Sequence, residues 1–230
     1  MLLGARQFFL SGGNSMAIKQ FVERTIEVVP RPDAISEIGA FAFAGCTSLT
    51  TGTFVNCTSI GQGSFLGCSN LTELTLPACT TINTNIPSTT VQWNSAGVAD
   101  NSGIVTVNMP LLSVCPYNCF KDMKQLKTVH IESCTALQDI VFSNSPAIEQ
   151  VYCPKVSSLV GRSFGYLGDL AKDIYFYMTQ RTTTQILDMS LGSHFGNTPT
   201  GKWPLFHFLG SDGSVEYDTS INSWVAIPQS

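Results

Sequence analysis

The sequence is poor in charged residues. Only 12% of its 230 residues are charged, about half the usual share, and they sum to a net charge of −4 at pH 7. Because no run of Lys or Arg occurs, neither nucleic acid nor an anionic membrane surface is expected as a partner. Hydrophobic residues make up 43% of the chain, yet they never form the roughly 18-residue run that a membrane helix needs. Membrane insertion is therefore not expected.

Motifs that would indicate catalysis are also missing. None of the three histidines (His130, His194 and His207) has a nucleophile and an orienting acid in a local motif. No phosphate-binding glycine loop, zinc-protease motif or serine-hydrolase motif occurs. Cys46, Cys57, Cys68 and Cys79 lack the close pairs that zinc sites use, and no second pair or His completes a metal site at Cys115 and Cys119. We therefore predict a non-catalytic protein without a cofactor. Whether Cys115 and Cys119 form a disulfide stays an open question.

The first residues, MLLGARQFFLSGGNSMA, only partly match a signal peptide. Arg6 interrupts the short apolar run where the hydrophobic region should lie. We expect a leader or short first segment over 1–23, with Met16 as an alternative start. Because no clear signal peptide is present, we expect the protein in a virion or in the cytoplasm, or at the cell surface if a signal has been trimmed.

What the chain does contain is a 22-residue repeat. Segments 38–59 and 60–81 are identical at ten of 22 positions without a gap. Repeats of this length indicate a solenoid. The recurring apolar positions, which we expect to form its core, are Phe43, Phe65, Phe120, Phe142 and Phe164; Cys46 and Cys68; and Leu49, Leu71, Leu126 and Ile148.

The spacing within each repeat predicts two walls of short strands. In L-x-x-V-x-I the last two apolar residues are two apart, so both point inward from an extended segment. A second wall is expected from I-G-x-x-x-F-x-x-C. Such strands cannot bury their inner faces alone, but stacked coils can pair them about 4.8 Å apart and align equivalent side chains.

The motif also carries a family resemblance. The pattern occurs in the segments AFAGCTSL (42–49), SFLGCSNLTELTLP (64–77), CFKDMKQLKTVHI (119–131) and SFGYLGDL (163–170). It resembles the BspA-type leucine-rich repeats of bacterial surface antigens and of gut-bacterial and phage proteins. The resemblance implies a mainly β, right-handed leucine-rich-repeat solenoid with coils of about 22 residues, serving adhesion or protein binding. Met123, Ser145 and Leu167 depart from it, since they replace the family cysteine.

The repeat also suggests how the chain is organised. The solenoid is expected over 24–177, ending in a strand at 172–178. An irregular excursion is expected at 83–103, where the register is lost. Residues 178–230 should form a β-rich cap, because the open end of a solenoid exposes core and strand edges. Whether 202–228 is a hairpin cap or a docking module stays open.

The outward side chains of the coils are the candidate binding residues. They are Trp93, His130, Asp139, Gln150 and Tyr152, and Val141 is placed outward beside Asp139. Extended repeat surfaces commonly serve as binding platforms, and aromatic side chains are frequent anchors. We therefore predict a protein- or glycan-binding adhesion protein. The alternative is a phage virion component such as a fibre, tail or capsid decoration protein, which would form a homo-oligomer.

Overall fold

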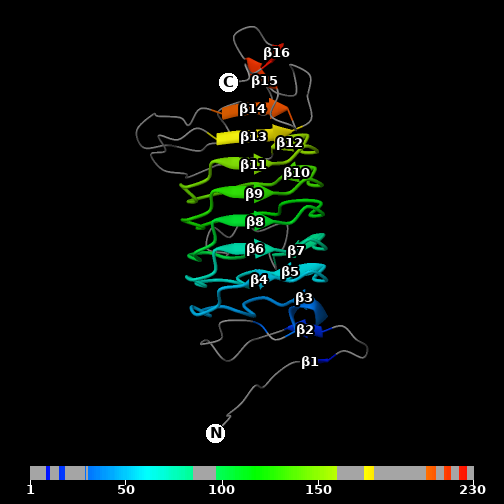
Figure 1. Cartoon of the computed structure of the whole chain (residues 1–230), viewed down its shortest axis with the longest axis vertical. Helices are drawn as coiled ribbons and strands as arrows, with labels where there is room; N and C mark the ends of the chain where they lie inside the picture. The colour runs from blue at the N-terminus through cyan, green and yellow to red at the C-terminus, as the bar shows by residue number, and fades with distance from the viewer. Residues whose placement is uncertain are drawn as a thin grey trace.

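The computed structural model describes residues 9–10, 16–18, 29, 31–84, 97–159, 174–178, 206–210, 215–218 and 223–226. In these residues the regular structure is β except for one 3-10 helix, η1 (Pro32–Ala34). The strands stack one above another along the long axis of the molecule (Figure 1). The predicted β-solenoid fold is therefore confirmed.

One wall of the solenoid is a nine-stranded sheet, called the long sheet below. Its order is β16-β15-β14-β13-β11-β9-β8-β6-β4. The strands are β4 (Gly52–Thr53), β6 (Glu73–Thr75), β8 (Thr106–Asn108), β9 (Thr128–His130), β11 (Gln150–Tyr152), β13 (Ile174–Met178), β14 (Phe206–Gly210), β15 (Val215–Asp218) and β16 (Ser223–Ala226).

The other wall consists of two shorter sheets. One has the order β1-β2-β3-β5-β7 and the other pairs β10 with β12. Their strands are β1 (Phe9–Leu10), β2 (Met16–Ile18), β3 (Ile35–Ile38), β5 (Ser59–Gly61), β7 (Thr81–Asn83), β10 (Ala136–Leu137) and β12 (Ser158–Leu159). The Ile of the I-G pair lies in β3 (Ile38) and in β5 (Ile60), whereas the Phe and Cys of the repeat lie in and just after the following turns. The second wall is thus shorter than the motif suggested.

The pairing register shows the length of each coil. Val107 lies opposite Val129 and Val129 opposite Val151, so each of these coils spans one sequence repeat. Leu74, however, lies opposite Val107, because β6 pairs directly with β8. The chain between them makes a single coil that is longer than a repeat by half. The predicted excursion at 83–103 falls within this interval, and its residues 85–96 lie outside the described residues.

The long sheet continues past the regular repeats. Phe176 of β13 lies opposite Val151, slightly more than one repeat later, and β14 pairs parallel to β13 after a longer interval still. Only β15 and β16 then run antiparallel. The segment 202–228, considered above as a hairpin, therefore supplies first a parallel strand of the wall and then the hairpin that ends the sheet.

The core between the walls is a single cluster of buried side chains. The rings of Phe43 and Phe65 stack with centroids 5.3 Å apart, and those of Phe120 and Phe142 are 5.7 Å apart. Between these two stacks the long coil places Val98 and Ala99, both fully buried. Aromatic stacking adds about 0.5–1.5 kcal/mol per pair beyond the area buried. Phe164 lies outside the described residues.

The turn that follows the phenylalanine position of each coil uses the left-handed backbone region, also in the long coil where Val98 and Ala99 precede it. Five residues with positive φ recur there coil after coil: Gly45, Gly67, Asn101, Asp122 and Asn144. Glycine occupies such positions without steric cost, and Asn and Asp tolerate them better than most residues. The turn is therefore kept where the sequence repeat weakens.

Candidate binding surface

Two columns of outward side chains run along the long sheet. Each central strand buries its middle residue and directs the flanking ones to solvent, as in β8, β9 and β11. Pairing aligns these flanking residues over successive coils. One column contains Glu73, Thr106, Thr128, Gln150, Tyr175 and His207. The other contains Thr53, Thr75, Asn108, His130, Tyr152 and Tyr177.

The C-terminal half of these columns is aromatic. We call His130, Tyr152, Tyr175, Tyr177 and His207 the aromatic platform. The ring centroids of His130 and Tyr152 are 4.3 Å apart and those of Tyr152 and Tyr177 are 4.2 Å apart, with interplanar angles of 8° and 7°. Tyr175 stacks on His207 at 4.6 Å. The rings lie face to face along the solenoid, and the side chains of Tyr152 and Tyr177 are also hydrogen-bonded to each other.

Both imidazoles of the platform contact a carboxylate. His130 Nδ1 lies 3.2 Å from Glu132 Oε1, and His207 Nδ1 contacts Glu216 Oε1. Burial, together with the neighbouring Tyr152 and Tyr175 side chains, raises the pKa of Tyr177. The Tyr177 hydroxyl therefore keeps its proton at neutral pH and can donate as well as accept a hydrogen bond.

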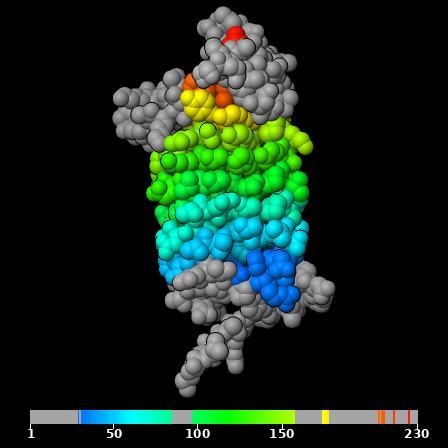
Figure 2. All heavy atoms as spheres, in the orientation of Figure 1, coloured from blue at the N-terminus to red at the C-terminus, as the bar shows by residue number. Residues whose placement is uncertain are grey.

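The N-terminal half of the same face has a different character. Its outward positions are occupied by Thr53, Thr75, Thr106 and Asn108, with Glu73 accepting a hydrogen bond from the Thr75 hydroxyl at 2.8 Å. The coils form parallel tiers along the molecule (Figure 2). The wall therefore passes from a hydroxyl-rich surface near β4 to an aromatic one near β13.

The structure brings together three of the five candidate residues. His130, Gln150 and Tyr152 lie on adjacent strands β9 and β11 of the same face. Asp139 lies apart from them, half-buried in the turn that follows β10. Trp93 lies outside the described residues.

The outward placement of Val141 is wrong. Val141 is 0% exposed, because residues 139–144 form a turn and not a strand, so the strand alternation that placed it outward does not apply.

Sequence reasoning missed the other half of the platform. Tyr175, Tyr177 and His207 follow intervals longer than the repeat, so they fall outside its register. The run Ile-Tyr-Phe-Tyr-Met at 174–178 alternates in the manner of a half-buried strand. That alternation is the signal that could have identified the two tyrosines as outward.

The described residues hold all eight cysteines, and each is a buried free thiol. Cys115 and Cys119, considered above as a disulfide, are both unbridged; the sulfur of Cys134, from the next coil, lies 3.7 Å from that of Cys115. Within the described ranges, no three His, Cys, Asp or Glu side chains are grouped so that they could hold a metal ion. Nor does the same part of the chain contain a helix of the length and apolarity needed to cross a membrane.

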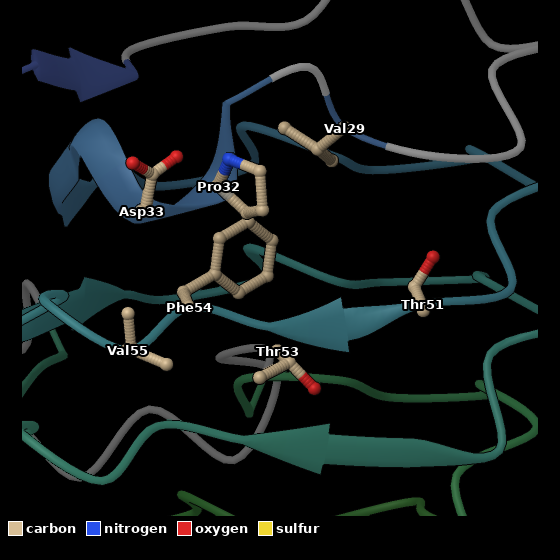
Figure 3. Close-up of a pocket in the computed structure, with 7 residues that line it drawn as sticks. All are labelled: Val29, Pro32, Asp33, Thr51, Thr53, Phe54 and Val55. Carbon is tan, nitrogen blue, oxygen red and sulfur yellow. The ribbon is translucent and has the colours of Figure 1, made fainter.

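A hollow of about 240 Å³ lies at the opposite end of the long sheet from the platform. Figure 3 shows the Phe54 ring beside Pro32, between η1 and β4, with Val29 above. Among the described residues of its lining, Asp33 is the one ionisable side chain, and the others are apolar side chains and the threonines Thr51 and Thr53. These described residues do not include a pair of groups for acid–base chemistry.

Comparison with known proteins places this architecture in a family. The sequence profile of the BspA type leucine rich repeat region matches residues 14–108 and 78–170, with six copies of the repeat. A search of curated proteins gave no match. The matched residues span well over half of the chain and include the long sheet from β4 to β11. The chain therefore belongs to the BspA-type leucine-rich repeat family, whose repeats form a non-enzymatic scaffold.

Proposed function

We propose that this protein is a non-catalytic binding or adhesion protein that holds a protein or glycan on the outer face of the long sheet. The observation that carries the proposal is the aromatic platform. Five aromatic side chains from four adjacent strands gather on one solvent-facing wall. Membership of a repeat family associated with binding supports the same conclusion.

The platform has the physical properties of a binding centre. Tyrosine supplies a large amphipathic contact area at low entropic cost, and it is enriched among the residues that dominate binding energy. Stacking on both sides holds the Tyr152 ring between His130 and Tyr177, so little side-chain freedom remains to be lost when a ligand binds. A rigid surface of this kind is suited to recognition without a conformational change.

The test compares two variants of the full chain on an array carrying gelatin, casein and several polysaccharides. The double variant Tyr152→Ala with Tyr177→Ala removes the centre of the platform. Thr81→Val, an exposed position on β7 of the other wall, is the control. We expect binding to at least one array component, weakened about tenfold or more in the double variant, since anchor residues contribute above about 1 kcal/mol.

Thr81→Val should bind as the native chain does. Equal binding by the native chain and the folded double variant would contradict the proposed role of this face. Circular dichroism of each variant checks that the β-solenoid is retained.

The alternative, a virion structural component, differs in its assembly state. A lone binding module should be a monomer in light scattering coupled to gel filtration. A stable trimer or larger assembly would instead favour the virion component, because virion fibres and decorations are built from several copies.

A further inference from the structure

We infer that the ligand of the aromatic platform is an uncharged, extended polysaccharide whose chain runs along the solenoid axis, across strands β8 to β13. This inference rests on the proposed function, because it names the ligand of the same face. Three features of the two outward columns support it: their periodicity, their charge and the groups that they expose.

The columns are periodic along the solenoid. Parallel pairing places equivalent outward residues on successive strands, as with Asn108, His130 and Tyr152, about 4.8 Å apart. A ligand lying along a column therefore meets similar groups at a constant interval. A polymer of repeating units can use such a row of contacts at every step, whereas the irregular surface of a folded protein can use only part of it.

The columns offer little uncompensated charge. Neither contains a Lys or Arg, and the one carboxylate in them, Glu73, accepts a hydrogen bond from Thr75. The carboxylates beside the platform, Glu132 and Glu216, each contact an imidazole. A charged polymer would gain no ion pair here and would lose solvation on binding. The face is therefore complementary to a neutral ligand.

The exposed groups match sugar hydroxyls. Because the rings of Tyr152 and Tyr177 face each other, a ligand approaching from solvent meets ring edges and phenolic hydroxyls. The amides of Asn108 and Gln150 stand in the same two columns. Phenol and amide groups each donate and accept hydrogen bonds, as a neutral polyol requires. A protein partner would gain most from ring faces that it could desolvate, and both faces of the central Tyr152 ring are already covered by His130 and Tyr177.

Affinity gel electrophoresis of the full chain tests the inference. The gels contain dextran, galactomannan, hydroxyethyl cellulose or soluble starch as neutral probes, and polygalacturonate as the charged one. The variant Tyr152→Phe with Tyr177→Phe keeps the stacked rings and removes two outward hydroxyls, so it should fold normally. Thr81→Val removes a hydroxyl from the opposite wall and is the matched control.

We expect at least one neutral polysaccharide to retard the native chain and Thr81→Val equally. The double phenylalanine variant should bind that probe about fivefold less tightly for each hydrogen bond lost. Polygalacturonate should retard none of them.

Three other results overturn the inference. Retardation by polygalacturonate alone, or by no polysaccharide, excludes an uncharged glycan. If gelatin on the array binds the native chain but not the Tyr152→Ala, Tyr177→Ala variant, the ligand is a protein, and the proposed function of the face still holds. Only unchanged array binding by that alanine variant removes the proposed function itself.

Discussion

The hydroxyl of Ser145 donates a hydrogen bond to the carbonyl oxygen of Phe120 at 2.7 Å, from the next coil. The thiol of Cys68 makes the equivalent contact with the Phe43 carbonyl oxygen at 3.1 Å, across the same sequence interval. Ser145 also accepts a hydrogen bond from the Met123 backbone N–H at 3.0 Å. The departure of Ser145 from the family cysteine therefore preserves the function of that position in the coil.

Replacing Ser145 tests this equivalence. Ser145→Ala should lower the free energy of unfolding by about 1–3 kcal/mol, because it leaves the buried Phe120 carbonyl and Met123 N–H without this partner. Ser145→Cys should lose less, since the thiol can donate the same bond. Urea denaturation of the three proteins measures the difference. A cysteine variant as unstable as the alanine variant would contradict the equivalence of serine and cysteine at this position.

Two glycine substitutions separate backbone strain from steric exclusion. Gly67 has φ +71°, and an added Cβ would meet nothing closer than 3.9 Å. Gly67→Ala should therefore lower stability by about 1–2 kcal/mol through the left-handed conformation alone. At Gly103 an added Cβ would lie 2.1 Å from the Ser69 carbonyl oxygen. Gly103→Ala should destabilise more, because backbone atoms must move apart, and thermal unfolding should rank the two in that order.

The buried carboxyl of Asp100 should make stability depend on pH. Burial raises the pKa of Asp100 from 3.8 to about 7, and the nearby Asp122 carboxylate adds to this shift. Two groups oppose the shift: the Gly97 N–H, which donates a hydrogen bond to Asp100 Oδ1, and the Lys121 side chain. Because the folded-state pKa is the higher one, the folded chain retains a proton that the unfolded chain releases above about pH 4. The contribution of Asp100 to stability therefore decreases between about pH 4 and pH 7 and then levels off.

Asp100→Asn should remove this dependence. At pH 8 the variant should be more stable than the native chain, by on the order of 2–4 kcal/mol, and the difference should shrink as the pH falls toward 4. Unfolding free energies across this range measure it. A difference that is constant with pH would show that Asp100 does not titrate there.

The thiols should be unreactive in the folded protein. Burial raises the pKa of Cys57 and Cys68 to about 12 and that of Cys79 to about 11. Since the thiolate is the reactive form, iodoacetamide at pH 8 should leave the native chain largely unlabelled. In urea without reductant, mass spectrometry should find eight alkylated cysteines. Six alkylated cysteines under these conditions would indicate a disulfide.

The recurrence of the sequence repeat alone predicts the architecture. Equivalent apolar residues at a constant interval can be buried only by stacking coils, so Phe43 and Phe65, or Val129 and Val151, had to lie one above the other. The outward direction of His130 and Tyr152 follows from the same register and the two-residue period of a strand. These conclusions need no long-range information, because each coil contacts mainly its neighbours.

The extent of the aromatic platform depends on tertiary pairing. Strands that follow intervals longer than the repeat still pair into the long sheet, because a strand needs only the backbone of its partner. The spacing of these residues in the sequence does not predict that Tyr177 stacks on Tyr152 or that His207 stacks on Tyr175. Backbone hydrogen bonds across irregular coils decide that five aromatic rings share one face, and thereby where a ligand would bind.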